Sequence, residues 1–216
     1  MEGHVLKEKA KSALRGYWAQ AIIVTVIVWL MTDAFTQQQT VETARSSFQL
    51  NFNLGDLLNL LLSGPLALGT VFFYMKIERR EAPRIGIIFD GFKFFKKSFI
   101  YHLITTMLIL LWTLLLIVPG IVAALRYSMG YYIMADNPEM SAMEALRESS
   151  DLMKGNKMAY FSLILSFVGW FIVSVITLGL GFLYLIPYFR MTSLNFYRSI
   201  TEDYEDNFYV EQEIDY

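Results

Sequence analysis

Two arginines within apolar stretches are the residues of this sequence best placed to do chemistry. Arg126 follows Pro119 by seven residues and precedes Tyr127, and Arg190 follows Tyr188 by two residues. If Pro119 lies at a membrane boundary, a rise of 1.5 Å per residue puts Arg126 about 10 Å deep. A charge at that depth costs at least about 2.5–3.5 kcal/mol, so it must be paired, hydrated or near the interface.

These four residues have two interpretations. In the first, Arg126, Arg190, Tyr127 and Tyr188 bind an anion or a lipid headgroup between helices. In the second, each arginine bonds to backbone carbonyls at a helix break or extends along its stem to the interface. The sequence contains no clear acidic partner for either arginine in the middle of an apolar stretch.

Catalysis and metal binding have little support in the sequence. There is no cysteine, and neither His4 nor His102 has the second histidine or neighbouring acid that a metal site or catalytic triad needs. The motifs of nucleotide-binding loops, metalloproteases and α/β-hydrolases are missing as well. We therefore expect a protein that is not an enzyme and that has no cofactor and no metal.

The composition predicts an all-α, polytopic membrane protein. Of the 216 residues, 55% are hydrophobic and 18% are charged, and a hydrocarbon core is crossed by about 20 apolar residues. The apolar stretches cover residues 17–35, 57–77, 99–118, 120–135, 159–177 and 181–196. We expect six transmembrane helices arranged as three helical hairpins, with a polar loop at 36–53 and tight turns at 119–120 and 178–181. No cleavage pattern follows the first stretch, so we expect a retained span rather than a signal peptide.

The basic residues predict the orientation. Fifteen of the 18 lysines and arginines fall in segments that the six-helix arrangement puts on one side, and such residues are held on the cytoplasmic side. We therefore expect a multi-pass protein of the cell membrane with both termini in the cytoplasm. The net charge of −2 argues against a nucleic acid partner.

The chain divides into one integral membrane domain, 1–200, and an acidic cytoplasmic tail, 201–216. The tail has seven carboxylates and no cation, so we expect it to be solvated and mobile. The alternative is that its aromatic residues dock on a protein partner or on the basic inner surface of the same chain.

The segments between the predicted hairpins are amphipathic. Phe92 and Phe95 alternate with Lys93, Lys96 and Lys97 at helical spacing, which is typical of a helix in the headgroup plane with cations facing anionic lipid. The alternative is an elbow that only fixes the next span.

Further along the chain, Ser141 and Glu144 form a capping-box pattern that predicts a helix start. The order serine, leucine, cation, glycine recurs at 12–16 and 150–155. This recurrence indicates an internal repeat of three hairpins.

Together these motifs resemble a bacterial integral membrane family catalogued as domain of unknown function 975. The motifs are KSALRGYW at 11–18, GPLALG at 64–69, ERRE at 78–81, FDGF at 89–92, VPG at 118–120, RY at 126–127 and ALRESSDLMKG at 145–155. The organisation is also similar to the membrane domain of some bacterial glycerophosphodiester phosphodiesterases, without a counterpart of their catalytic barrel. The resemblance implies a plasma-membrane protein of unassigned activity and supplies no catalytic residues.

Two functions follow as hypotheses. The first is a transport or lipid-handling module, in which the arginines meet an anionic group. The second is a non-catalytic scaffold or accessory subunit, which binds a membrane protein partner, or a second copy of itself, through its inner segments and tail. The partners expected are the lipid bilayer, including anionic lipid, and such a protein.

Overall fold

The computed structural model describes residues 3–32 and 54–214, where all regular structure is helical. The predicted loop at 36–53 lies outside the described residues. The helices are α1 (Gly3–Leu14), α2 (Trp18–Thr32), α4 (Leu54–Glu78), the 3₁₀-helix η1 (Ile85–Phe94), α5 (Phe95–Leu115), α6 (Ile117–Arg126), α7 (Gly130–Asp136), α8 (Ala142–Leu152), α9 (Lys157–Leu165), α10 (Val168–Ile176) and α11 (Phe182–Ile214). The expectation of an all-α protein is confirmed for the described residues.

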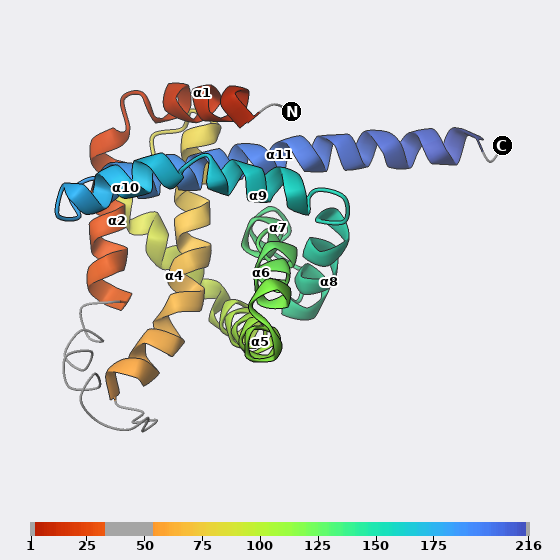
Figure 1. Cartoon of the computed structure of the whole chain (residues 1–216), viewed down its shortest axis with the longest axis horizontal. Coiled ribbons are helices and arrows are strands. Elements are labelled where there is room, and N and C mark those ends of the chain that lie inside the picture. The colour runs from red at the N-terminus through yellow and green to blue at the C-terminus, as the bar shows by residue number, and fades with distance from the viewer. Residues whose placement is uncertain (1–2, 33–53, 215–216) are drawn as a thin grey trace.

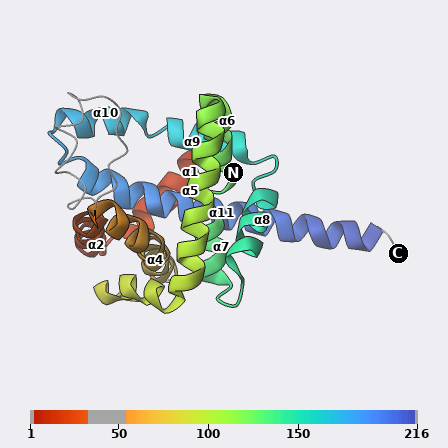
Figure 2. The same cartoon turned by 90° about the horizontal axis from the view of Figure 1, so that it is seen from below.

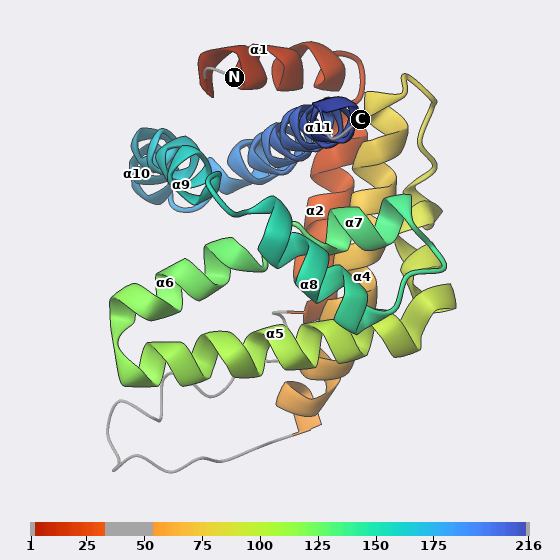
Figure 3. The ribbon, with the colours of Figure 1, turned by 90° about the vertical axis from the view of Figure 1, so that its right-hand side faces the viewer.

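The helices form antiparallel pairs that run in different directions. Helices α2 and α4 run side by side in Figures 1 and 3, whereas α10 and α11 lie across them. Helices α5 and α6 form a pair along a third direction, seen side-on in Figure 3 and again in Figure 2. Helix α1 packs across α11. The core therefore sits where the three pairs cross.

Three helical segments are long and apolar enough to cross a membrane. They are Gly55–Glu78, Ile85–Leu115 and Lys157–Ile176, and α1 with α2 adds a fourth if this pair, bent by 97°, is one broken span. The predicted stretches 120–135 and 181–196 are not among them, because the first is interrupted after Arg126 and the second belongs to α11, which carries Arg190 and Arg198. The count of six spans stays a prediction.

The turn expected at residues 119–120 occurs earlier. Leu116 alone is extended, with φ −160° and ψ 144°, and Pro119 and Gly120 belong to the first turns of α6. Proline is tolerated there because the first N–H groups of a helix have no intrahelical acceptor. Gly120 approaches Thr113 of α5 so closely that a β-carbon would overlap it. The small residue therefore serves the packing of α5 on α6 rather than the turn.

The acidic tail is helical along most of its length, and its solvation and mobility stay a prediction. Helix α11 continues through it as far as Ile214. Residues 201–214 contain neither glycine nor proline, so no residue in this stretch breaks a helix that has already begun. The last two residues of the tail lie outside the described residues.

The helix start predicted at Ser141 is confirmed. Ser141 Oγ accepts from the Glu144 N–H at 3.3 Å and Glu144 Oε2 accepts from the Ser141 N–H at 2.8 Å, which is the predicted capping box. Gly16 and Gly155 both have a left-handed backbone, with φ of 92° and 79°, just after α1 and α8. Only glycine adopts this conformation without strain. The threefold repeat itself stays a prediction.

The phenylalanine-rich segment is helical, as its spacing predicts, with a 3₁₀-helix as far as Phe94 and an α-helix from Phe95 onward. Phe89 and Phe92 lie in η1 and are three residues apart, which aligns them on one side of a helix with three residues per turn. Helix η1 also packs directly on the backbone of α4. A β-carbon on Gly69 would overlap the Ile88 carbonyl, and one on Gly91 would overlap the Pro65 carbonyl.

Large apolar side chains are exposed where the pairs end. Leu114 is 84% exposed and Ile117 is 72% exposed at the α5–α6 end, and Leu178 is 96% exposed after α10. Soluble proteins rarely expose such continuous apolar surface. This surface is suited to contact with lipid tails.

The close approach of η1 to α4 predicts that a single methyl group added at Gly69 strongly lowers the stability of the fold. Gly69→Ala should destabilise the fold by about 3 kcal/mol, since the backbone of η1 must move. The control Gly86→Ala lies in η1 with no atom within 4 Å of the new β-carbon, so its effect should stay within about 0.5 kcal/mol. Thermal unfolding in nanodiscs checks both, and equal midpoints would contradict this packing.

Candidate functional site

Arg126 is the last residue of α6, and its contacts join α6 to α8. Its Nε donates to Ser150 Oγ at 2.5 Å, and its guanidinium lies 5.6 Å from the centre of the Tyr127 ring. The Ser149 hydroxyl donates to the Arg126 carbonyl at 3.0 Å. The C-terminus of a helix carries a partial negative charge, which also favours a cation there. These contacts give Arg126 a role in holding the end of α6.

The break after Arg126 is satisfied by side chains. The Met129 N–H donates to Ser149 Oγ at 3.2 Å, and the Tyr101 hydroxyl donates to the Tyr127 carbonyl at 2.6 Å. Groups freed at a helix break need such partners when water is scarce. Tyr127 therefore contributes its carbonyl to the packing of α5 against the α6–α7 break.

Arg190 lies on α11 among tyrosines of three other helices. Its charge is within electrostatic range of four hydroxyls, those of Tyr74 on α4, Tyr131 and Tyr132 on α7, and Tyr160 on α9. Arg190 is exposed, whereas Tyr74, Tyr132 and Tyr160 are buried. None of the ion pairs within the described residues includes Arg190. We call these five residues the arginine–tyrosine site.

Two hydroxyls of this site already have side-chain partners. The Tyr160 hydroxyl donates to Ser193 Oγ at 3.2 Å, and the Tyr131 hydroxyl lies 3.1 Å from His102 Nδ1. His102 therefore has a hydrogen-bonding role in the packing of α5 against α7. These bonds hold the two phenol rings in place beside Arg190.

The Tyr74 hydroxyl is different, because it is buried and forms no hydrogen bond with any described residue. The nearest polar side chain is that of Thr25, whose hydroxyl donates to the Ala21 carbonyl at 2.9 Å and keeps its lone pairs as acceptors. A buried hydroxyl without a partner costs about 1–3 kcal/mol. The arginine–tyrosine site thus contains an accessible cation and a hydroxyl with an unused hydrogen-bonding capacity.

The structure does not bring the four predicted site residues together. Arg126 contacts α8, whereas Arg190 faces the tyrosines, and the two share no partner. Tyr188 lies two residues before Arg190, but its ring packs against Phe167, at 5.2 Å between centres, and lies 5.6 Å from Lys11 Nζ. The tyrosines that do surround Arg190 come from other helices, and no spacing in the sequence points to them.

The predicted interface residues lie on η1 and at the start of α5. Lys97 Nζ donates to the Pro138 carbonyl at 2.7 Å, so it joins α5 to the α7–α8 loop. Lys93 pairs with Asp90 at 2.7 Å and Lys96 is exposed. Phe92 is partly buried, and Phe95 is 38% exposed. Their contact with anionic lipid stays a prediction.

A cluster of charges that the sequence did not single out ties three helices together. Arg198 on α11 donates to both carboxylate oxygens of Glu78, at 2.9 and 3.1 Å, and to Asp136 Oδ2 at 2.7 Å. Arg79 lies 3.8 Å from the other Asp136 oxygen. We call these four residues the ion-pair cluster. The only signal for it in the sequence is that two acids lie at the ends of apolar stretches on the basic side.

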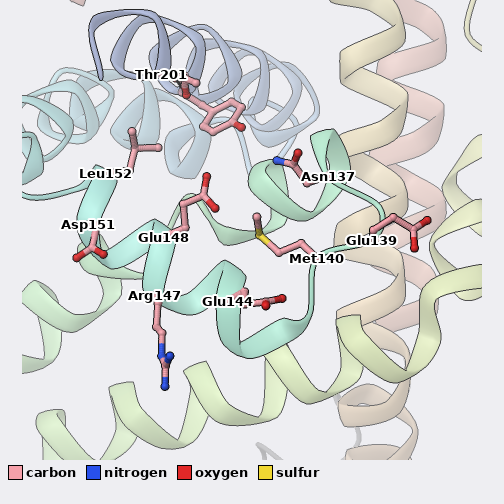
Figure 4. A pocket seen from close by; sticks show the side chains of 10 residues that line it. Asn137, Glu139, Met140, Glu144, Arg147, Glu148, Asp151, Leu152 and Thr201 are labelled. Atoms are coloured by element: carbon pink, nitrogen blue, oxygen red, sulfur yellow. Dashed lines mark hydrogen bonds between the residues drawn. The ribbon is translucent and has the colours of Figure 1, made fainter. Parts of the chain in front are cut away.

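An acidic cleft lies between the α7–α8 loop, α8 and α11. Its volume is about 850 Å³ and its wall includes Glu139, Glu144, Glu148 and Asp151. Figure 4 shows the Glu148 side chain directed into the cleft and the Arg147 side chain directed away from it. Burial raises the pKa of the Glu148 carboxyl above its usual range. The cleft therefore presents mainly negative charge.

The described residues thus define an all-helical protein with three or four helices able to cross a membrane. The chain belongs to the family described as "Protein of unknown function (DUF975)", whose model matches residues 1–125 and 113–204. The family expected from the motifs is confirmed, and the similarity to phosphodiesterase membrane domains stays a prediction. No curated protein and no solved structure matches the chain.

The ion-pair cluster predicts that Arg198 contributes more to the stability of the fold than an exposed cation does. Arg198→Met leaves Glu78 and Asp136 without their main partner, and their side chains are 22% and 19% exposed. We expect a loss of about 2 kcal/mol in unfolding free energy, less than for a fully buried pair. Lys154→Gln removes a pair with Asp151 whose side chains are 70% and 54% exposed, and should change stability by at most about 0.5 kcal/mol. Thermal unfolding compares the two, and similar losses would contradict a special role for Arg198.

The acidic cleft predicts a pH-dependent effect of Glu148→Gln. Because burial raises the pKa of Glu148, the folded protein holds this proton more tightly than the unfolded chain. The penalty of the buried charge is absent at pH 3.5 and appears as the pH rises through the carboxyl range. The variant should therefore melt higher than the wild type at pH 7.5 and at the same temperature at pH 3.5. A pH-independent difference would show that the charge is not responsible.

Proposed function

We propose that this protein is a lipid-handling membrane protein that binds an anionic headgroup at Arg190. The observation that carries the proposal is the accessible guanidinium of Arg190, which lies within electrostatic range of four tyrosine hydroxyls and has no carboxylate partner among the described residues. A guanidinium forms two parallel hydrogen bonds with a phosphate, and these are stronger than bonds between neutral groups. The unused hydroxyl of Tyr74 supplies a further donor.

The position of the site along α4 supports a headgroup rather than a solute in transit. Tyr74 lies four residues before Glu78, the last residue of a segment able to span the membrane, which is about 6 Å along the helix. Lys76, Arg79 and Arg80 lie at the same end of α4. Basic residues mark the cytoplasmic end of a span, so the site would meet the inner leaflet near its headgroups.

The same argument orients the rest of the proposed protein. Both termini lie in the cytoplasm of a bacterial cell, and α4 crosses the plasma membrane with its basic end on the cytoplasmic side. Lys96 on the η1–α5 segment then faces anionic lipid at the inner surface, whereas Lys93 is paired with Asp90. The role is one of binding rather than catalysis.

The test is the lipid that stays with the protein. The full chain is exchanged into nanodiscs of equal phosphatidylglycerol and phosphatidylcholine, re-extracted in mild detergent and analysed for bound lipid by mass spectrometry. Loss of a charge-assisted contact of about 1.5–3 kcal/mol lowers affinity roughly 10- to 100-fold. Arg190→Gln should therefore lose most of the enrichment in phosphatidylglycerol, and Arg190→Lys should keep part of it.

Two controls separate the site from general charge attraction. Lys93→Gln removes one positive charge from an exposed pair, and should keep the enrichment. Tyr74→Phe should lose enrichment while its lipid-free stability stays equal or rises, since it deletes a buried hydroxyl without a partner. Equal losses for Arg190→Gln and Lys93→Gln would contradict a specific site. Loss of the lipid upon addition of glycerol phosphate would identify a soluble phosphate ester as the ligand instead.

The acidic cleft favours a second candidate function, a non-catalytic scaffold or accessory subunit. Four carboxylates around a cleft of about 850 Å³ suit a basic segment of a protein partner, because complementary charge steers association. Under this function the Arg190→Gln variant would carry the same lipids as the wild type, so the lipid measurement distinguishes the two.

A further inference from the structure

A second cleft, separate from the arginine–tyrosine site, lies where α1, the end of α4 and α11 meet. Its volume is about 550 Å³, within the range of roughly 300–1,000 Å³ typical of ligand sites. Every lining side chain is polar or charged, namely Lys9, Glu78, Arg79, Asn195, Arg198, Ser199 and Glu202. We call it the charged cleft.

Some of these groups are already used by the protein. Arg198 is held by Glu78 and by Asp136 at 2.7–3.1 Å. The Asn195 amide donates to the Leu6 carbonyl at 3.1 Å and fixes α1 on α11. These contacts fix one wall of the cleft, on which the charge of Arg198 is neutralised by its two carboxylate partners.

The groups that remain are of both signs. Lys9 and Glu202 line the same cleft, yet neither takes part in an ion pair within the described residues. Arg79 reaches Asp136 only at 3.8 Å, and its side chain is 55% exposed. The cleft thus offers two cations, Lys9 and Arg79, and one carboxylate, Glu202, that form no close ion pair with one another.

We propose that the charged cleft binds a phosphoethanolamine headgroup, with the phosphate on Lys9 and Arg79 and the ammonium on Glu202. A purely anionic headgroup would satisfy the cations and meet repulsion from Glu202. A phosphocholine headgroup would keep the charge attraction to Glu202 but lose the hydrogen bond, because its trimethylammonium has no N–H to donate to a carboxylate. Bonds between an ammonium and a carboxylate are about twice as strong as neutral ones. The amine is therefore the feature that the cleft distinguishes.

The test measures selectivity between two headgroups of equal charge. The full chain is exchanged into nanodiscs of equal phosphatidylethanolamine and phosphatidylcholine, and the bound lipids are analysed as above. The wild type should retain the ethanolamine lipid several-fold over the choline lipid. Glu202→Gln should bring that ratio close to one, whereas Lys9→Gln combined with Arg79→Gln should reduce both lipids. Glu148→Gln, with the same charge change in the acidic cleft, should keep the ratio of the wild type.

Two results would overturn the proposal, namely a wild type without preference or a Glu202→Gln variant with the wild-type ratio. Glu202 is exposed, so its replacement does not endanger folding. The source of the headgroup is settled in lipid-free detergent. A Glu202-dependent rise in melting temperature with soluble phosphoethanolamine identifies a free solute as the ligand. A rise only with diacyl lipid identifies a membrane lipid. No rise with either ligand excludes the site. Arg190→Gln leaves this ratio unchanged, so the two proposed sites stand or fail separately.

Discussion

The contact on which the arrangement of helices depends is the one between Arg198 and the carboxylates of Glu78 and Asp136. It joins the ends of α4 and α7 to the middle of α11, three elements that run in different directions. A planar guanidinium with donors on two edges is suited to this task, since it binds two carboxylates at fixed angles. Because the crossing is fixed here, the arginine–tyrosine site and the charged cleft are formed by neighbouring parts of the same helices.

A second theme is the treatment of broken helices. At the break between α6 and α7, hydroxyls from α5 and α8 bond to the free backbone groups. At the break between α9 and α10 the partner is Lys7 of α1, whose Nζ donates to the Ser166 carbonyl at 3.0 Å and lies 4.4 Å from the centre of the Phe167 ring. In an apolar environment an unpaired carbonyl costs several kcal/mol. The polar residues inside this fold are therefore largely explained by backbone groups that would otherwise lack partners.

The sequence predicts features that depend on neighbouring residues along the chain. The capping box at Ser141, the helical class and the family follow from short patterns that the structure or the family match confirms. The partners of Arg190 are not predictable in this way, because Tyr74, Tyr131 and Tyr160 come from three helices whose crossing is a tertiary property. The 3₁₀ winding of η1 is not predictable either, since a phenylalanine spacing of three residues suits both an α-helix and a 3₁₀-helix.

The contact between α4 and η1 has a mechanical consequence. No side chain separates Gly69 from the Ile88 carbonyl or Gly91 from the Pro65 carbonyl, so the backbones of α4 and η1 are in direct contact. A single transmembrane helix adapts to a thinner or thicker bilayer by tilting. Here α4 cannot tilt without carrying η1, and with it the beginning of α5. A change in membrane thickness would therefore be transmitted from one helix pair to the next as a coupled rotation.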